Sequence, residues 1–373
     1  MNKSIIVKLT DVCKDIFAGG DVPKDNYSSK PNDIYCIPIY TNGEQNAGLY
    51  GFTTKARVFE PSLTVSARGT IGFTAIRTTP FFPAIRLITL TPNEKIDIKY
   101  LFYVTQNYKF ENGGTSIPQL TVPMLKSYTF PLPSLEIQKQ IAATLDKVTR
   151  TIDLCNAILE KLDLLVKARF VEMFGDPVTN DMNWQTHSVE EVCSDIYGGG
   201  TPSKAHPEYY ENGNIPWVSS KDMKADIITE SQIYINQLGV ENSTTKMVPV
   251  NSVIMVIRSG ILKHTLPVAI NAVPITVNQD LKVFIPDDCI LALFLSTLFK
   301  MLEKDILSGV RAVTADNIEF NSLKQRQIIV PPIELQTQFA AFVEQTDKSK
   351  LAVKKVLEKA ETLKKALMQE YFG

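Results

Sequence analysis

The sequence lacks the features of a membrane-spanning, secreted or disulfide-stapled chain. It has no apolar run long enough to cross a bilayer, and its first residues do not form a signal-peptide pattern. The five cysteines are odd in number and form no C-x-x-C pair, which favours reduced thiols over disulfides or a zinc site. We therefore expect a cytoplasmic protein.

The motifs of the common catalytic centres are also missing. The dipeptide Gly-Lys never occurs, so there is no nucleotide-binding P-loop, and neither H-E-x-x-H nor the Asn-Pro-Pro-aromatic motif of amino-methyltransferases is found. The three histidines are not spaced as metal ligands. Pro286-Asp287 lacks a downstream E-x-K, which leaves a nuclease centre unsupported. We expect no catalytic residues and no metal site, and hence a binding protein.

The length and charge of the chain are those of a soluble protein with more than one core. A chain of 373 residues suits two domains, and its net charge is −1. The charge is unevenly distributed, because residues 1–133 hold 14 basic and 10 acidic side chains whereas residues 180–331 hold 12 and 17. Binding to nucleic acid is therefore favoured by the first region, and the second would need its basic side chains on one face.

What the chain does contain is an internal repeat. The phrase "PLPSLEIQKQ" near Pro131 returns as "VPPIELQTQF" near Val330, and "FVEMFG" returns as the terminal "MQEYFG". Glu136 and Glu334 are 198 residues apart, and the same shift holds without a gap from residue 136 to residue 175. A weaker echo joins "VCKDIFAGGDVPK" to "VCSDIYGGGTPSK", whereas the stretches between differ. This pattern indicates one scaffold that presents two different surfaces.

The constant part of the repeat is predicted to be a long helix. Its apolar positions alternate in steps of four and three, as in the seam of a coiled coil. Ser134 suits an N-cap, and Gly175 before Asp176-Pro177 ends the helix, which then covers about residues 135–173. The predicted seam and docking positions of both copies are Ile141, Leu145, Val148, Ile152, Leu159, Leu162, Val166, Phe339, Val343, Val353, Leu357 and Leu367.

The second copy of the helix is the expected partner of the first, although Thr346 and Lys350 interrupt its stripe. Because the chain must return, we expect the two helices to pack antiparallel and to relate the halves by an approximate twofold axis. A coiled coil between two molecules is the alternative.

The regions between the helices read as α+β without regular β-α alternation. Short strands are predicted in phrases such as "LTVSARGTIGFTAI" and "SVIMVIRSG", with helices around 97–109 and 289–306. The complete prediction is an α+β fold with two globular domains separated by two long antiparallel helices. The expected parts are 1–133 (first domain), 134–177 (first helix), 178–332 (second domain) and 333–373 (second helix).

Several phrases are candidates for contacts with a polyanion. The glycine-rich phrases, each followed by a lysine, either grip a phosphate or form a surface turn. Two arginine-containing phrases each follow an apolar strand, Arg68-Gly69-Thr70 and Arg258-Ser259-Gly260. They either read base edges or form hairpins with solvated arginines. Asn278-Gln279 suits adenine, but we favour the cap of a turn. The candidate DNA-binding residues are Lys24, Arg68, Gly69, Thr70, Thr201, Ser203, Lys204, Lys221, Arg258, Ser259, Gly260 and Arg311.

These phrases in this order resemble the specificity subunit of type I restriction–modification enzymes. The resemblance is carried by "PLPSLEIQKQIAATLDKV", "LLVKARFVEMFGDP", "VPPIELQTQFAAFV", "DIYGGGTPSK" and "IPWVSSKDM", and it covers nearly the whole chain. It implies two target-recognition domains that each read half of a split, asymmetric DNA target, with the helices setting the spacer. It also implies two methylation subunits docked on the helices and restriction subunits beyond them. S-adenosylmethionine, ATP and Mg would belong to those partners, and this chain would need no cofactor.

Two departures from the family pattern and two alternatives remain. "DIFAGGDVPK" is a poorer copy of the family's opening phrase, and the second region is unexpectedly acidic. The chain is alternatively a specificity protein of a related methyltransferase or phage-defence system, or a coiled-coil adaptor that binds no DNA. An enzyme with its own chemistry is the least favoured reading.

Overall fold

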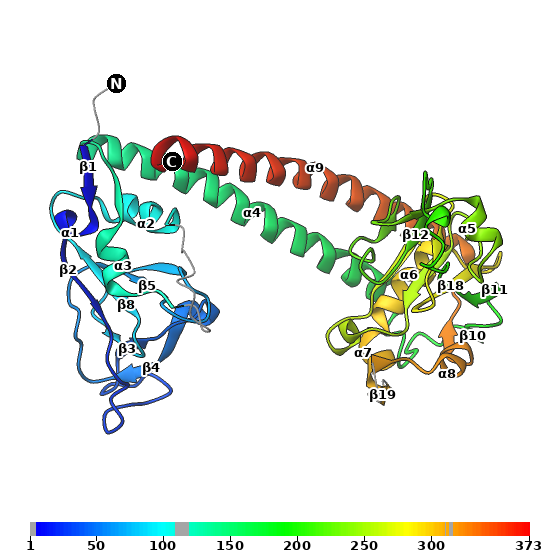
Figure 1. The fold of residues 1–373 in the computed structure, drawn as a ribbon. Coiled ribbons are helices and arrows are strands. Elements are labelled where there is room, and N and C mark those ends of the chain that lie inside the picture. The colour runs from blue at the N-terminus through cyan, green and yellow to red at the C-terminus, as the bar shows by residue number, and fades with distance from the viewer. Residues whose placement is uncertain (1–4, 109–118, 310, 313–315) are drawn as a thin grey trace. The chain divides into compact units, whose positions relative to one another are not determined.

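The computed structural model describes residues 5–108, 119–309, 311–312 and 316–373. The chain divides into two compact units, of which unit 1 holds residues 1–157 and 353–373 and unit 2 holds residues 158–352. Each unit contains one strand-rich region and parts of two long helices (Figure 1). We call the part before the first long helix the first region, and the part between the long helices the second region.

In the part of the first region that the structure describes, short strands are accompanied by three α-helices. The strands are β1 (Ile5–Lys8), β2 (Cys13–Ala18), β3 (Ile37–Tyr40), β4 (Leu49–Thr53), β5 (Ser62–Val65), β6 (Thr74–Arg77), β7 (Phe82–Pro83), β8 (Ile88–Pro92) and β9 (Thr129–Leu132). The helices are α1 (Leu9–Val12), α2 (Ile98–Gln106), α3 (Val122–Ser127) and the 3-10 turn η1 (Gln45–Gly48). Asp97 caps α2 by accepting from the backbone N–H groups of Lys99 and Tyr100.

The second region is built in the same way. Its strands are β10 (Thr186–Ser188), β11 (Cys193–Gly198), β12 (Ile215–Val218), β13 (Ile227–Ile228), β14 (Tyr234–Ile235), β15 (Val253–Val256), β16 (Val268–Asn271), β17 (Thr276–Val277), β18 (Leu281–Pro286), β19 (Arg311–Ala312), β20 (Asp316–Asn317) and β21 (Gln327–Ile329). Its helices are α5 (Gln237–Glu241), α6 (Ala292–Met301), α7 (Glu303–Ser308), α8 (Phe320–Lys324), η2 (Pro207–Tyr209) and η3 (Gly260–Lys263). The single helix predicted around 289–306 is thus two helices that meet at Leu302.

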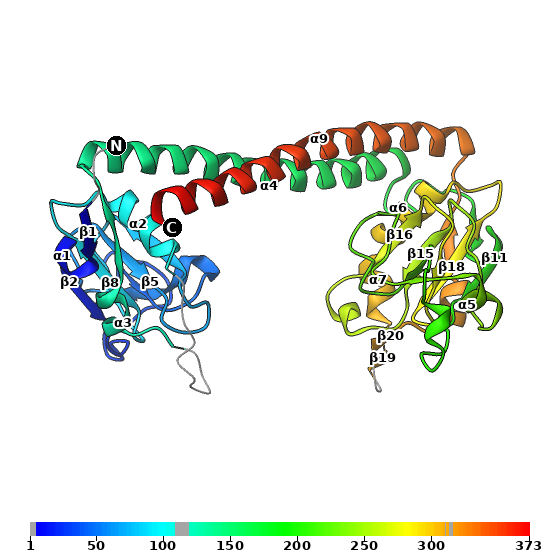
Figure 2. The same ribbon diagram turned by 45° about the horizontal axis from the view of Figure 1, so that its top comes forward.

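The two regions share one strand order, which confirms the predicted internal repeat. The sheet β2-β8-β5-β6 of the first region returns as β11-β18-β15-β16 in the second, where β13 extends it. Likewise β4-β3-β7 returns as β14-β12-β17, and the pair β1-β9 returns as β10-β21. A register shift lies between Cys13 and Asp15 and again between Cys193 and Asp195. In each region a helix packs on the larger sheet, α2 against β5 and β6, and α6 against β15, β16 and β18 (Figure 2).

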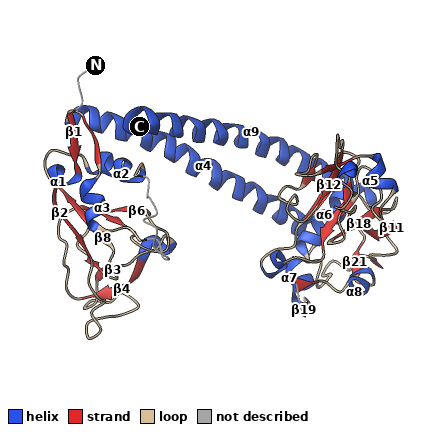
Figure 3. Ribbon diagram, viewed as in Figure 1, coloured by secondary structure: helices blue, strands red, loops and turns tan. Residues whose placement is uncertain are grey.

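Each region is followed in the chain by one long helix, α4 (Leu135–Phe174) or α9 (Ile333–Phe372), of 40 residues each (Figure 3). The backbone carbonyl of Ser134 accepts from the N–H of Gln138, so the helix begins where the N-cap was predicted. At the other end Gly175 adopts a φ of 74°, and its N–H donates to the carbonyl of Val171. A left-handed glycine of this kind is a common helix terminator.

The long helices pack against each other and run antiparallel, as predicted. In unit 2 the ring of Phe174 lies 5.6 Å from that of Phe339, and Asp163 lies beside Lys350. The residue number thus falls along α4 as it rises along α9. In unit 1 the first turns of α4 and the last turns of α9 share one apolar cluster, to which Leu145 and Phe372 both belong.

The predicted seam positions are shielded from solvent. Leu145, Phe339 and Val343 are buried, and the other nine are partly buried. The two interruptions of the stripe are accommodated by polar contacts. Thr346 is buried and donates its hydroxyl to the carbonyl of Phe342, and Lys350 pairs with Asp163.

Candidate nucleic-acid interface

In the first region, the side chain of Asn42 joins two loops that follow strands. Its Oδ1 atom accepts from the N–H of Ala67 at 2.7 Å, and its Nδ2 atom donates to the carbonyl of Ile85 at 2.6 Å. The β5–β6 loop, which carries the predicted Arg68, is thereby held beside the turn between β7 and β8. Because a buried or half-buried amide that serves two backbones fixes both, these loops form one surface.

The predicted residues of the β5–β6 loop are exposed on that surface. Arg68 donates to the Oε1 atom of Gln119 at 2.9 Å, and Gly69 and Thr70 are open to solvent. The φ of Gly69 is 69°, which a glycine adopts without strain. Lys24 is exposed in the segment after β2, and no hydrogen bond between described residues joins it to the Asn42 loops.

The turn from Ala84 to Leu87 is a feature that sequence reasoning missed. Its central residues, Ile85 and Arg86, have φ values of 52° and 60°, and the N–H of Leu87 donates to the carbonyl of Ala84 at 3.1 Å. This is the pattern of a type I′ turn, which Asn-Gly normally occupies. A β-branched residue is strained in this conformation, and such strain concentrates at functional sites. No turn motif was there to be recognised.

Neighbouring backbone groups hold this strained turn in place. The N–H of Ile85 donates to the carbonyl of Gly20 at 2.7 Å, and the N–H of Arg86 donates to that of Gly19 at 3.1 Å. Ile85 is 45% exposed and Arg86 is exposed. No hydrogen bond or ion pair fixes the Arg86 guanidinium to any residue that the structure describes. The turn therefore exposes a cation and an apolar side chain to solvent.

The corresponding turn of the second region, Asn278 to Leu281, differs in residues and in conformation. Ala84 donates its N–H to the carbonyl of Tyr40, as Asn278 does to that of Val218, so the two turns occupy equivalent places. Asn278 caps its own turn, since its Oδ1 atom accepts from the N–H of Asp280 at 3.1 Å. The structure thus shows the capping role that we favoured for Asn278.

Two predicted DNA-binding residues converge on this second turn. Arg258 donates from Nε to the Oδ1 atom of Asp280 at 2.7 Å, and its Nη2 atom lies 2.6 Å from the same oxygen. The hydroxyl of Thr201 donates to the Oε1 atom of Gln279. Arg258 is therefore not a free cation, and its charge is balanced by a carboxylate 22 residues away in sequence.

The remaining predicted residues of the second region lie around this turn or in separate loops. Ser203, Lys204 and Lys221 are exposed, and Gly260 faces open space. Ser259 accepts from the N–H of Ile261 and so begins η3. Arg311 lies in β19, which pairs with β20, and Asn317 of β20 also bridges to Arg258. The side chain of Arg311 lies outside the described residues.

The glycine-rich phrases owe their glycines to close packing of backbones. A Cβ atom on Gly19 would lie 2.4 Å from the carbonyl oxygen of Pro83, and one on Gly199 would lie 1.9 Å from that of Val277. Pro83 and Val277 are equivalent, because Pro83 is the last residue of β7, which pairs with β3, and Val277 is the last residue of β17, which pairs with β12. Contact with a neighbouring strand therefore accounts for the repeated glycine at this place.

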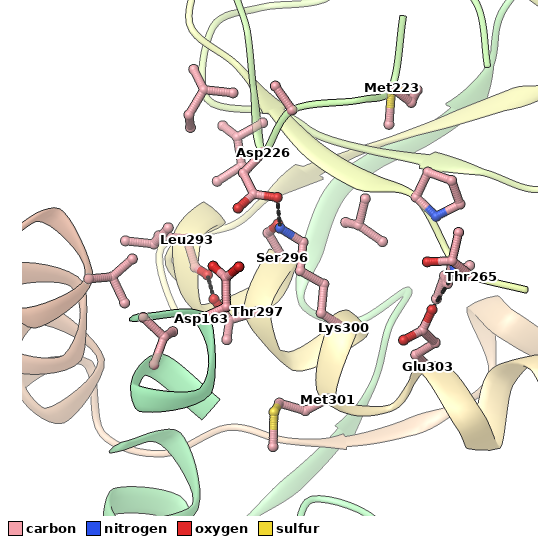
Figure 4. Close-up of a pocket in the computed structure, with 18 of the residues that line it drawn as sticks. Asp163, Met223, Asp226, Thr265, Leu293, Ser296, Thr297, Lys300, Met301 and Glu303 are labelled. Carbon is pink, nitrogen blue, oxygen red and sulfur yellow. Dashed lines mark hydrogen bonds and ion pairs between the residues drawn. The ribbon is translucent and has the colours of Figure 1, made fainter. Parts of the chain in front are cut away.

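A pocket within unit 2 has a volume of about 510 Å³ (Figure 4). Its acidic side chains are held by donors. Lys300 donates to Asp226 at 2.6 Å, Lys350 donates to Asp163 at 2.7 Å, and Glu303 accepts from the N–H of Leu266. The pocket therefore does not gather these carboxylates as free bases.

Thiol chemistry is disfavoured at the buried cysteines. Burial raises the pKa of Cys13 and of Cys193 to about 12, which keeps both as neutral thiols at pH 7. All five cysteines are free. Among the described residues no group of three or more histidine, cysteine, aspartate or glutamate side chains is placed to hold a metal ion. No helix within the described ranges is long and apolar enough to span a membrane.

Comparison with known proteins identifies the family of this fold. The model of the type I restriction modification DNA specificity domain matches residues 2–164 and again 182–364. The type I restriction enzyme EcoR124I/EcoR124II specificity subunit of Escherichia coli is 30% identical over 339 residues, which cover 85% of this chain and 80% of that protein. The MjaIX specificity subunit of Methanocaldococcus jannaschii is 25% identical over 359 residues, covering 87% of this chain and 80% of the relative.

Solved structures show the same fold. The crystal structure of the S subunit of a type I restriction–modification system from M. genitalium superimposes with a TM-score of 0.63 at 15% identity. It is covered over 97% of its length, and this chain over 100%. A chain from a study of complex assembly and conformational transition of the type I system gives a TM-score of 0.57 at 17% identity. The match covers 98% of that chain and 100% of this one.

Proposed function

Because the chain belongs to the type I restriction–modification DNA specificity family, we propose that it selects the DNA sequence on which a type I complex acts. Residues 1–133 and 178–332 are the proposed recognition domains, each of which reads one half of a bipartite target. The long helices, within 134–177 and 333–373, set the spacer between the halves. The subunit itself carries no catalytic residues in this proposal and acts in the cytoplasm with its DNA.

The observation that carries the proposal is one scaffold with two different turns at the same place. The strand order is shared, but the first region presents Ile85-Arg86 where the second presents Gln279-Asp280. Two copies of one reader with different contact residues recognise unequal half-sites, so the target is not a palindrome. Arg68 and Arg86 are the proposed base contacts of the first domain, and Arg258 and Thr201 those of the second, with Lys24, Lys204 and Lys221 at phosphates.

The charge distribution suggests how binding is divided between the chain and its partners. The first region is net basic, whereas the second is net acidic and ties Arg258 to Asp280. Phosphate neutralisation supplies most of the affinity of proteins for DNA. We therefore propose that methylation subunits supply much of the phosphate contact around the second half-site, and that their S-adenosylmethionine serves adenine methylation.

The long helices carry exposed apolar side chains against which these subunits can dock. Six large apolar side chains of α4 and α9 are about half exposed or more. They are Leu154, Leu164, Leu165, Leu351, Val356 and Leu363. These side chains are available to partner subunits that cover the helices in the assembled complex. Restriction subunits with ATP and Mg would join the assembly beyond the methylation subunits.

A gel-shift experiment with the methylation partner tests the proposal against a coiled-coil adaptor. The complex is titrated onto labelled chromosomal fragments with random-sequence duplex as competitor. We expect a subset of fragments to remain bound at competitor concentrations that release the rest. If every fragment is released at the same concentration, the chain does not select sequence, and the acidic second region would then be better explained by an adaptor.

A further inference from the structure

Each long helix buries one glutamine in its first turn. Gln138 is the fourth residue of α4 and Gln336 is the fourth residue of α9. Both are 0% exposed. A polar side chain at the start of a helix is normally solvated, and burying an amide is costly unless its hydrogen bonds are satisfied. The two residues are equivalent in the repeat, so the same burial occurs twice.

In unit 1 the amide of Gln138 connects the helix to two segments of the first region. Its Nε2 atom donates to the carbonyls of Lys95 at 3.0 Å and Pro133 at 2.9 Å. Its Oε1 atom accepts from the N–H of Asp97 at 2.8 Å. Pro133 is the link from β9 to the helix, and Asp97 caps α2, which packs on the sheet.

In unit 2 the amide of Gln336 makes the same three bonds. Its Nε2 atom donates to the carbonyls of Cys289 at 3.0 Å and Pro331 at 2.8 Å. Its Oε1 atom accepts from the N–H of Leu291 at 2.9 Å. Leu291 stands directly before α6 as Asp97 stands before α2. The surrounding residues differ between the regions, yet the bonding pattern is unchanged.

Only a carboxamide of this length supplies both kinds of partner. Two carbonyls require two N–H donors, and one backbone N–H requires an acceptor. A glutamate of the same shape lacks the donors when it is ionised, and a methionine lacks all three groups. Either change would leave buried backbone groups without partners. The amide thus fixes the first turn of the long helix against two other segments at once.

We propose that Gln138 and Gln336 are positioning residues that fix the orientation of each recognition domain relative to the long helix that follows it in the chain. This inference rests on the proposed function, because a fixed direction matters only if the domain must meet DNA at a fixed place. A reader that tilts on its helix would still recognise its own half-site, but it would meet that half-site at more than one distance from the other. The two glutamines therefore act on spacer selectivity and leave base selectivity unchanged.

The chain provides its own matched controls. Gln140 and Gln338 lie two residues further along the same helices, occupy equivalent places in the repeat and are exposed. Gln138→Met and Gln336→Met remove the buried amides with little change of volume, whereas Gln140→Met and Gln338→Met make the same change in solvent. All four are assembled as full chains with their methylation subunits, and folding is checked by circular dichroism and thermal melting.

The measurement is methylation of duplexes that keep both half-sites and vary the spacer by one or two base pairs around the preferred length. We expect the wild type and both controls to prefer one spacer. In each buried variant, the ratio of methylation at that spacer to methylation at the other spacers should fall by about fivefold or more. The preferred half-site bases stay the same. A uniform loss of activity at every spacer would show a merely structural role and would overturn the inference, as would a variant with unaltered spacer preference.

If a methionine variant does not fold, the isosteric Gln138→Glu or Gln336→Glu replaces it. These keep the acceptor for Asp97 or Leu291 and leave at least one of the two carbonyls without a donor, and the same broadening of the spacer profile is expected. Failure of the proposed function is distinguishable, because the wild-type complex would then show no sequence-dependent methylation at all. Wild-type selectivity together with unchanged profiles in the variants overturns the positioning role alone.

Discussion

The Nζ atom of Lys350 lies 2.7 Å from the Oδ1 atom of Asp163 and joins the two long helices by an ion pair. The lysine side chain is only 15% exposed, and Asp347 lies 3.4 Å from the same nitrogen. Burial by itself would lower the pKa of Lys350, but the hydrogen bond and charge of Asp163, with those of Asp347, outweigh it and raise the pKa. The lysine that interrupts the apolar seam is therefore paired in its charged form.

Replacing Asp163 and replacing Lys350 should have unequal effects on the free energy of unfolding. Asp163→Ala leaves a half-buried ammonium with only the longer contact to Asp347, and we expect the free energy of unfolding to fall by about 1 kcal/mol. Lys350→Met continues the apolar stripe and should be neutral or stabilising by up to about 1 kcal/mol. Urea unfolding measures both, with the exposed Glu160→Ala as a control on the same helix. Equal losses for Asp163→Ala and Lys350→Met would contradict this account of the seam.

The end of α4 is anchored by an aromatic cluster, and its loss should be costly. Phe174 is 0% exposed, and its ring lies 5.0 Å from that of Phe294 and 5.6 Å from that of Phe339. Phe174→Ala should lower the free energy of unfolding by about 3–5 kcal/mol through the cavity that it leaves. The neighbouring Val171→Ala, at a side chain that is 44% exposed, should change it by about 0.5 kcal/mol or less. Denaturant titrations measure both changes. Similar losses of unfolding free energy for Phe174→Ala and Val171→Ala would contradict the anchoring of α4 by this cluster.

The strained turn of the first region predicts a trade between stability and recognition. Replacing Ile85-Arg86 with Asn-Gly supplies the residues that a type I′ turn prefers, and stability should rise by about 1–2 kcal/mol. The same change removes the proposed base contact, so selectivity at one half-site should fall about tenfold or more. The single change Ile85→Asn relieves strain but keeps the arginine, and it should keep selectivity.

Thermal melting and a methylation assay on single-base variants of the target measure the two effects. If Asn-Gly stabilises the chain while both half-sites are read as before, the turn does not contact bases. If the change destabilises the chain, the strain argument is wrong.

Asp146 of α4 contacts α2 and should make the stability of unit 1 depend on pH. Its carboxylate accepts from the hydroxyl of Tyr103 at 2.8 Å and from Lys99 at 2.5 Å. Burial would raise the pKa of Asp146, but these hydrogen bonds and the charges of Lys99 and Arg150 together hold the pKa below its ordinary value. A lowered pKa stabilises the fold above the unfolded value of about 4, and this contribution is lost as the pH falls through the folded value.

The stability difference between the wild type and Asp146→Asn should therefore be constant from about pH 5 to pH 7 and shrink below about pH 4. Unfolding titrations at several pH values measure it, with Asp153→Asn at an exposed aspartate of the same helix as a control. A difference that persists unchanged at low pH would show that the charge of Asp146 is not what stabilises this contact.

The sequence was most informative where the pattern is local and repeated. The long helices follow from a regular alternation of apolar residues, and their equivalence follows from a constant shift between Glu136 and Glu334. The Gly at 175 that ends α4 is a signal of the same kind. The helical pattern and its end depend on residues within a few turns of one another, and the repeat is visible by direct comparison of two segments, so the sequence alone predicts them.

Contacts between distant residues could not be predicted in this way. Nothing near Arg258 in sequence indicates that Asp280 neutralises it, and nothing near Gln138 indicates that Asp97 and Lys95 bury its amide. Gln138 and Gln336 occupy equivalent places in the repeat, but a polar residue in a first turn is ordinarily solvated. Ile85-Arg86 was missed because its turn lacks the Asn-Gly signal.

The most direct test of the whole account is single-molecule sequencing of methyladenine in DNA modified by the assembled complex. The wild type is compared with a variant in which seven residues are inserted into both α4 and α9. Seven residues extend each helix by about 10 Å, which corresponds to about three base pairs of DNA. We predict an asymmetric bipartite target whose half-sites stay the same while the spacer lengthens by about that number. Altered half-sites, or a spacer of unchanged length, would contradict the claim that the helices hold two independent readers apart.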